Sequence, residues 1–274
     1  GVDDDTLTFA TEGDAADAAS VIVNADEAGV ATLRGQTVTF SEIENIEGTQ
    51  ADDTIDASGD TTGMGLAGKG GDDSILGGSG ADDIDGDAGD DTLSGAGGDD
   101  TISGGAGNDV VFGGAGNDSV LGNSGDDTIQ GGAGDDYLDG DSGNDSIAGG
   151  AGNDQLVGDD GNDTLFGEAG DDEIFSSSGD NTVDGGTGND TVFMGTGNDT
   201  IDGGVDDDTI FGEAGDDIAV LTADFGDDTY TGGETDETTG DMIDATALTE
   251  NTTVVFSGAE EGTVAQGSNS VDFV

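Results

Sequence analysis

An aspartate that stands two positions before an aliphatic residue returns every nine residues through the middle of this chain of 274 residues. Residues 104–130 read GGAGNDVVF, GGAGNDSVL and GNSGDDTIQ, so Asp109, Asp118 and Asp127 occupy the same place in three successive phrases. If the copies stack as neighbouring strands, their carboxylates form a row with a separation of about 4.8 Å. Two like charges at that distance repel by about 1 kcal/mol in water, and by several times more near a protein surface. A row of this kind needs a cation.

The composition determines where the cation comes from. The chain has 65 acidic residues and no histidine, and Arg34 and Lys69 are its two basic residues, which gives a formal net charge of −63. The protein therefore cannot neutralise its own carboxylates, and repulsion excludes nucleic acid and anionic membranes as partners. Without cysteine there is neither a disulfide nor a thiolate metal site. Oxygen ligands favour a hard ion, and Ca²⁺, which accepts about six to eight oxygens in loose geometry, fits better than Mg²⁺.

The phrases run without a gap from residue 68 to residue 220, as 17 copies of nine residues. Low hydrophobicity with high net charge is typical of a disordered chain, but a random acidic tract does not hold a register. Position 6 of each phrase is the candidate metal ligand. These residues are Asp73, Asp82, Asp91, Asp100, Asp109, Asp118, Asp127, Asp136, Asp145, Asp154, Asp163, Asp172, Asn181, Asp190, Asp199, Asp208 and Asp217.

The other columns of the repeat predict the elements that position these ligands. Position 8 is aliphatic from Ile75 to Ile210 and becomes Ala219 in the last copy. Position 4 is glycine except at Asp206, and position 5 is Asp or Asn except at Ala81, as tight turns require. Positions 7 to 9 suit a short strand with its central side chain inward. Two phrases then close one coil of 18 residues, and stacked coils form two flat parallel sheets around a thin aliphatic core.

The phrase G-G-x-G-x-D-x-U-x, in which U is a large aliphatic residue, resembles the hemolysin-type calcium-binding nonapeptide repeat of the RTX (repeats-in-toxin) family. The resemblance covers over half of the chain. It implies an all-β fold, a right-handed parallel β-roll with short β-rich caps or spacers at both ends. It also implies that Ca²⁺ ions lie between neighbouring turns, held by the position-6 carboxylates and by backbone carbonyls of the glycine loops.

Alternate phrases should face alternate sides of the coil, which divides the ligands into two rows with room for up to about 15 calcium ions. Asn181 keeps an oxygen ligand but has no charge, and its phrase begins with Ser176-Ser177-Ser178 in place of glycines. We therefore expect a weak, ion-poor site there. Asp53 and Asp228 are candidate end sites in degenerate copies of the phrase, and Met64 replaces the aspartate in residues 59–67.

The sequence predicts three segments, which are a β-rich spacer or cap at 1–47, the roll at 48–231 and a second spacer or cap at 232–274. The two ends resemble each other, because Asp241-Met242-Ile243 matches Asp5-Thr6-Leu7 and Val271-Asp272-Phe273 matches Val38-Thr39-Phe40. This favours one period of a longer array of roll blocks and spacers. Similar acidic composition at both ends is the alternative explanation.

Two features of the outer surface raise the question of a further ligand. The outward position 9 is apolar on four successive turns, at Val157, Phe175, Phe193 and Phe211. Such a surface is expected to be covered either by the C-terminal segment or by a partner molecule. The phrase GTGND, which suits ice binding on some related repeats, occurs at 186–190 and 195–199. Adjacent phrases face opposite sides, so these two do not form a continuous array.

We therefore expect a non-enzymatic protein. Without histidine or cysteine there is no catalytic triad and no imidazole base. The expected function is that of a calcium-dependent structural segment in a large bacterial protein, which would belong to a surface layer, an adhesin or a matrix filament. The RTX resemblance implies that the chain is exported by type I secretion and folds outside the cell. Its expected partners are calcium ions and further copies in an assembly, without membrane insertion. The alternatives are the folding and secretion module of an exoenzyme or toxin, and an ice-binding module.

Overall fold

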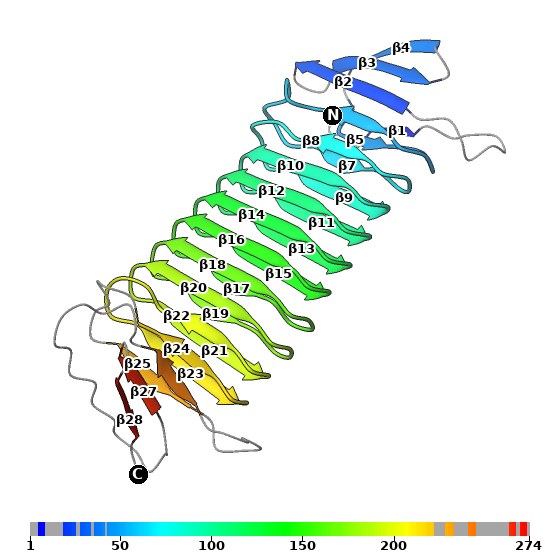
Figure 1. The fold of residues 1–274 in the computed structure, drawn as a ribbon. Coiled ribbons are helices and arrows are strands. Elements are labelled where there is room, and N and C mark those ends of the chain that lie inside the picture. Colours follow the sequence, from blue (N-terminus) through cyan, green and yellow to red (C-terminus); the bar gives the residue numbers. More distant parts are fainter. Residues whose placement is uncertain are drawn as a thin grey trace. The chain divides into compact units, whose positions relative to one another are not determined.

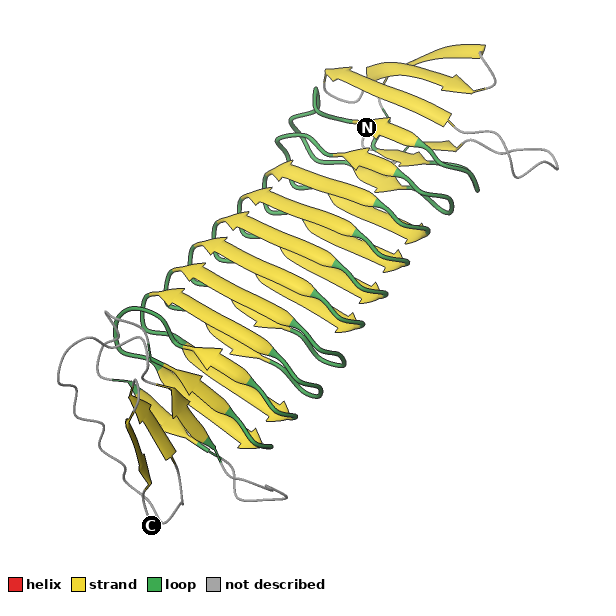
Figure 2. Cartoon of the chain, in the orientation of Figure 1, coloured by secondary structure: helices red, strands yellow, loops and turns green. Residues whose placement is uncertain are grey.

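The computed structural model describes residues 5–8, 19–25, 28–33, 36–41, 43–221, 228–232, 241–244, 263–266 and 269–272. These residues form strands and turns without a helix (Figure 2). No helix among them is long and apolar enough to span a membrane. The chain divides into two compact units, Gly1–Ser146 and Ile147–Val274, and each is described by itself.

The first unit contains two sheets, which we name A1 and B1 (Figure 1). Sheet A1 has the order β1 (Thr6–Thr8), β5 (Asn45–Glu47), β7 (Gly65–Ala67), β9 (Asp83–Ala88), β11 (Thr101–Ala106), β13 (Ser119–Ser124) and β15 (Tyr137–Ser142). Sheet B1 has the order β4 (Gln36–Ser41), β3 (Ala28–Leu33), β2 (Ala19–Ala25), β6 (Thr54–Asp56), β8 (Ser74–Leu76), β10 (Thr92–Gly97), β12 (Val110–Ala115) and β14 (Thr128–Ala133).

The second unit also contains two sheets, A2 and B2. Sheet A2 has the order β17 (Gln155–Val157), β19 (Glu173–Phe175), β21 (Thr191–Thr196), β23 (Thr209–Ala214) and β25 (Thr229–Thr231). Sheet B2 has the order β16 (Ser146–Ala151), β18 (Thr164–Ala169), β20 (Thr182–Thr187), β22 (Thr200–Asp202), β24 (Ile218–Val220), β26 (Met242–Asp244), β27 (Thr263–Gln266) and β28 (Asn269–Asp272).

The strands of the roll pair in parallel with a register of 18 residues. Leu93 of β10 pairs with Val111 of β12, and Ile102 of β11 pairs with Val120 of β13 on the other sheet. Consecutive phrases therefore alternate between the two sheets, and two phrases make one coil (Figure 1). The predicted fold class, an all-β parallel β-roll with 18 residues per turn, is confirmed.

The core of each unit is one layer of aliphatic side chains between its two sheets. The position-8 residues from Ile75 to Ile210 are 0–4 % exposed, as the period-two pattern of a short strand predicts. Burying one such side chain stabilises the folded state by about 1.5–3 kcal/mol. A single coil buries two of these side chains against some 18 ordered residues, so only stacked coils are stable.

The turns depend on residues that accept positive φ. Position 4 is left-handed in copy after copy, with φ of 140° at Gly107 and 137° at Gly116. A Cβ atom at Gly116 would collide with the carbonyl group of Gly98 in the neighbouring coil. Asp206 is the one residue other than glycine at this position, and it also takes a positive φ of 85°. Backbone geometry and coil spacing thus explain why position 4 is glycine in all the other phrases.

Each unit also contains antiparallel strands. In the first unit, β3 pairs with β4 from Ala28 with Ser41 to Leu33 with Gln36. In the second unit, β27 pairs with β28 from Thr263 with Asp272 to Gln266 with Asn269. The predicted resemblance between the two ends stays a prediction. Parallel pairing continues past residues 48 and 231 to β1 and β26, and the boundaries at these residues stay a prediction.

Candidate metal centres

The position-6 side chains form ladders of hydrogen bonds along the turns of each unit. The backbone N–H of Asp73 donates to Oδ1 of Asp91 (2.7 Å), and Asp91 donates in the same way to Asp109 (2.8 Å). These carboxylates lie just before the strands, and the position-6 residues from Asp73 to Asp217 are 0–3 % exposed. Each unit holds two such rows, one beside each sheet, which is the predicted arrangement.

The same bond recurs through both units. In the first unit it joins Asp53 to Asp73, Met64 to Asp82, Asp82 to Asp100, Asp100 to Asp118, Asp109 to Asp127, Asp118 to Asp136 and Asp127 to Asp145. In the second unit it joins Asp154 to Asp172, Asp163 to Asn181, Asp172 to Asp190, Asn181 to Asp199, Asp190 to Asp208, Asp199 to Asp217, Asp208 to Asp228 and Asp217 to Asp241.

The ladder bonds use only Oδ1 of each carboxylate, and the second oxygen, Oδ2, takes no part in them. It is buried and has no hydrogen-bond donor at Asp73, Asp91, Asp100, Asp109, Asp118, Asp127, Asp172, Asp190, Asp199 and Asp208. A buried polar atom without a partner costs about 1–3 kcal/mol, and more when it is charged. A row of such atoms requires a ligand that supplies positive charge.

Most of the open oxygens lie beside a small cradle in the backbone. A Cβ atom added at Gly113, which opens the phrase of Asp118, would lie 2.6 Å from Oδ2 of Asp118 and 2.7 Å from the carbonyl oxygen of Gly131. At Gly122 the corresponding distances to Asp127 and Gly140 are 2.5 and 3.0 Å. Glycine at position 1 therefore leaves space into which one carboxylate oxygen and one carbonyl oxygen of the next coil both point.

This donor set fits Ca²⁺. Carboxylate and carbonyl oxygens are hard ligands, and calcium accepts them in loose geometry. Among the described residues, no three acidic side chains converge on one point. A centre in these cradles would therefore combine single carboxylates with backbone carbonyls, so that the fold rather than an acidic cluster supplies most of the ligands.

Burial perturbs the same carboxyl groups. Desolvation, as the largest cause, raises the pKa of Asp73, Asp100 and Asp127 to about 7, while the hydrogen bond from the preceding coil opposes the shift. In the second unit desolvation raises the pKa of Asp172 and Asp208 to about 7. Neighbouring carboxylates of the row raise these values further. The rows thus hold their negative charge unfavourably without a cation.

The predicted ligands at the N-terminal end differ from the others. Oδ2 of Asp82 accepts a hydrogen bond from the backbone N–H of Gly78 (2.7 Å). Asp53 accepts bonds from the N–H groups of Ala19 and Thr49, one on each oxygen. Both oxygens of these two carboxylates therefore accept hydrogen bonds from backbone N–H groups, unlike the carboxylates with an open Oδ2.

Asn181 is likewise hydrogen-bonded through its second side-chain atom. Its Oδ1 accepts the ladder bond from Asp163 (2.8 Å), and its Nδ2 donates to Oγ of Ser176 (2.7 Å) and to the carbonyl oxygen of Gly179 (3.0 Å). The donor group Nδ2 of Asn181 thus lies at the place where the neighbouring phrases of Asp172 and Asp190 have an Oδ2 atom without a donor. The ladder itself continues through Asn181, whose N–H donates to Asp199 (2.8 Å).

Two features of the rows were missed in the sequence. Asp241 accepts the ladder bond of Asp217 (3.0 Å), and burial raises the pKa of its carboxyl group. The signal was the D-x-U spacing of Asp241 to Ile243 beyond the interrupted register. In addition, the exposed position-5 residues form a second ladder, whose bonds run in the opposite direction along the chain. The N–H of Asn108 donates to Asp90 and the N–H of Asp126 donates to Asn108, each at a distance of 2.8 Å.

The outer face of sheet A2 carries the predicted aromatic ladder. Phe175, Phe193 and Phe211 pair across neighbouring strands, and Val157 precedes them. The ring centroids are 5.2 and 4.7 Å apart and the rings are parallel within 5°. Much of the C-terminal segment that was considered as its cover lies outside the described residues.

The structure also separates the two GTGND phrases. Thr187 is the last residue of β20 in sheet B2, whereas Thr196 is the last residue of β21 in sheet A2. The expected absence of a continuous threonine and asparagine array at these phrases follows from the alternation of the sheets.

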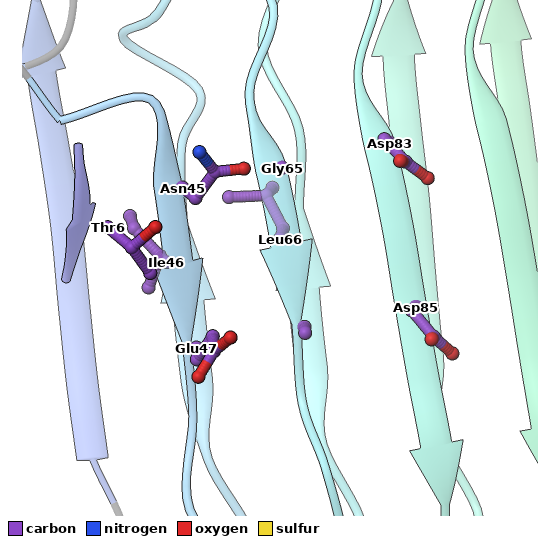
Figure 3. A pocket seen from close by; sticks show the side chains of 9 residues that line it. Thr6, Asn45, Ile46, Glu47, Gly65, Leu66, Asp83 and Asp85 are labelled. Carbon is purple, nitrogen blue, oxygen red and sulfur yellow. The ribbon is translucent and has the colours of Figure 1, made fainter. Parts of the chain in front are cut away.

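A shallow hollow of about 330 Å³ lies on the first unit, over β5, β7 and β9 (Figure 3). It forms because Gly65 and Ala67 leave space between the longer side chains of Glu47, Asp83 and Asp85. Its lining combines acidic, amide and hydroxyl groups with aliphatic atoms, and it holds none of the position-6 ligands. It is therefore separate from the candidate metal centres.

Comparison with known families identifies the cation. The model of the RTX calcium-binding nonapeptide repeat matches residues 66–93, 86–120, 121–156, 157–192 and 195–219, which together exceed half of the chain. No curated protein matches the chain significantly. RTX repeats bind calcium, and the matched residues contain every aspartate named above with an open Oδ2.

Proposed function

Because the chain belongs to the family of the RTX calcium-binding nonapeptide repeat, we propose that it is a calcium-dependent structural segment of a larger secreted or cell-surface protein. It folds and stiffens when calcium binds outside the cell. The observation that carries this proposal is the row of buried Oδ2 atoms without donors, most of them beside a backbone carbonyl of the next coil. The residues that would hold calcium are the position-6 aspartates whose Oδ2 remains open, from Asp73 to Asp208.

The proposal explains why folding would be confined to the exterior. At the low calcium concentration of a cytosol the carboxylate rows repel, and the thin aliphatic core does not compensate. Extracellular calcium modules bind at about 10⁻⁴ to 10⁻³ M. An ion present at ten times its dissociation constant stabilises the fold by about 1.4 kcal/mol, and several ions together exceed the stability of a typical domain. Export of the unfolded chain by type I secretion fits this dependence.

Assembly into a surface layer, adhesin or matrix filament is the second part of the proposal. The antiparallel pairs β3–β4 and β27–β28 support an array in which roll blocks alternate with β-rich spacers. The chain's role in such an array is structural and not catalytic. An exoenzyme or toxin that uses the roll as its folding and secretion module is the alternative, and the two antiparallel pairs favour the array.

Calcium titration of the chelated chain at pH 8 tests the proposal. Circular dichroism reports β structure, and sedimentation velocity on the same samples reports self-association. We expect β structure to appear near millimolar calcium, followed by association. A folded chain without calcium at this pH would contradict the central argument, and a folded chain that stays monomeric at high concentration would leave a calcium-stabilised spacer without assembly.

A further inference from the structure

The phrase of Asn181 differs from its neighbours at two places that face each other. Position 1 is glycine in every phrase from residue 68 to residue 220 except at Ser176 and Met194, and position 6 is aspartate except at Asn181. Ser176 and Asn181 belong to the same phrase, and they are the two positions that build the cradle elsewhere. Both are buried, at 6 % and 2 % exposure.

The two replacements complement each other chemically. In the neighbouring phrase of Asp172, Oδ2 points at the Cβ position of Gly167 and has no donor. In the phrase of Asn181, Nδ2 takes the place of that oxygen and donates to the hydroxyl group that Ser176 adds (2.7 Å). An amide N–H₂ group is a donor and cannot ligate a cation. The hydroxyl group also occupies space that glycine leaves empty.

Two further serines of the phrase connect the same coil to the preceding one. Oγ of Ser177 donates to Asp159 and Oγ of Ser178 donates to Asp160, both over 2.9 Å. The loop 176–181 thus uses hydroxyl and amide groups at the places where other copies have glycines and a carboxylate. Its bonds to both neighbouring coils are complete without an ion.

We propose that the Asn181–Ser176 pair is an ion-free link built into one calcium row of the second unit. It holds its coil by hydrogen bonds, excludes calcium from this one cradle and leaves the ions of the other cradles unaffected. The proposal rests on the proposed function, since an excluded ion has meaning only if the other cradles bind calcium. It gives the row one position whose stability does not depend on the calcium concentration.

Equilibrium dialysis with radioactive calcium on the full chain at pH 8 tests this link. Asn181→Ala should bind the same number of ions as the wild-type chain, whereas the matched Asp172→Ala should bind one fewer. The double variant S176G/N181D, which restores the consensus cradle, should bind one more. The slope of its unfolding free energy against the logarithm of free calcium, which counts the ions bound on folding, should also increase by one ion.

The outcomes separate the two proposals. A loss of one ion in Asn181→Ala would overturn the ion-free link, because calcium would then occupy that cradle in the wild-type chain. An unchanged count in S176G/N181D would show that this pair does not keep the ion out. An unchanged count in Asp172→Ala would contradict the assignment of the ligands, and a wild-type chain that binds no calcium would contradict the proposed function itself.

Discussion

The backbone N–H of Asp109 donates a hydrogen bond to Oδ1 of Asp127, 18 residues ahead, over 2.7 Å. The two residues belong to neighbouring coils, so a side chain proposed as a calcium ligand also closes the backbone ladder between coils. One oxygen of each carboxylate therefore serves the fold, and the other is available to the ion. Each of these functions can be removed separately.

Asp127→Asn and Asp127→Ala should separate the two functions. Asparagine retains an Oδ1 atom that accepts the N–H of Asp109, but it loses the open oxygen, so the chain should bind fewer ions. Alanine loses both, and the N–H of Asp109 becomes a buried donor without an acceptor, which costs about 1–3 kcal/mol more. Urea unfolding at saturating calcium measures the difference.

The control for these variants is the adjacent exposed residue. Asp126→Asn keeps the acceptor that receives the N–H of Asn144, and asparagine is common at position 5 of the repeat. Its calcium stoichiometry should equal that of the wild-type chain. Equal stability of Asp127→Asn and Asp127→Ala would contradict the structural function of Oδ1.

Gly113→Ala should prevent binding in one cradle. The added Cβ atom would lie 2.6 Å from Oδ2 of Asp118 and 2.7 Å from the carbonyl oxygen of Gly131, which is closer than van der Waals contact allows. We expect the loss of one ion and a destabilisation of about 1–3 kcal/mol from overpacking. Isothermal titration calorimetry gives the stoichiometry.

Gly97→Ala is the matched control, because its Cβ atom would lie 3.6 Å from the carbonyl oxygen of Ala115, an ordinary contact. Position 3 is already alanine at Ala106 and Ala115. This variant should bind the wild-type number of ions. A Gly113→Ala chain with unchanged stoichiometry would show that the ions do not lie beside position 1.

Much of the fold could be predicted because each column of the repeat has one physical cause. The inward aliphatic at position 8 and the turn residues at positions 4 and 5 specify the strand, the turn and the 18-residue coil, and these are confirmed. The row of position-6 residues followed from the same register. The hydrogen bond from Asp109 to Asp127 did not, because periodicity places a side chain at a turn without specifying which backbone donor its oxygen meets.

The ends were harder to predict for a related reason. Asp82 lies within the register and has the same place in its phrase as the other ligands, yet the backbone N–H of Gly78 in the same phrase donates to its second oxygen. Asp241 lies outside the register and was missed, although it accepts the next ladder bond. Where the repeat changes, the neighbours of a residue are determined by the path of the chain and no longer by its place in the phrase.

The calcium-free chain should fold more stably at pH 5 than at pH 8. Burial raises the pKa of Asp73, Asp100 and Asp127 to about 7, well above the value of about 4 for an exposed aspartate. The folded chain therefore binds more protons than the unfolded chain between these values, so its stability falls as the pH rises through this range. Circular dichroism of calcium-stripped samples at pH 5 and 8 measures this.

Calcium and protons compete for the same oxygens of the folded chain, so either one can stabilise it. Because protons no longer do so at pH 8, the calcium concentration at the folding midpoint should rise as the pH rises from 5 to 8. Samples stay above the isoelectric point of about 4.1, where low net charge promotes precipitation. A midpoint independent of pH would contradict the assignment of the buried carboxylates as the ligands.

Phe193→Ser should weaken self-association of the calcium-loaded chain. Phe193 stacks on Phe175 and on Phe211, with centroids 5.2 and 4.7 Å away, so its loss removes the centre of the apolar ladder on sheet A2. Each aromatic pair contributes about 0.5–1.5 kcal/mol, so the unfolding free energy should also fall. Phe112→Ser is the control, since Phe112 lies on sheet B1 and is 39 % exposed. If urea unfolding shows lower stability for Phe193→Ser but sedimentation equilibrium shows unchanged association, the ladder is covered by the chain itself and does not contact a second copy.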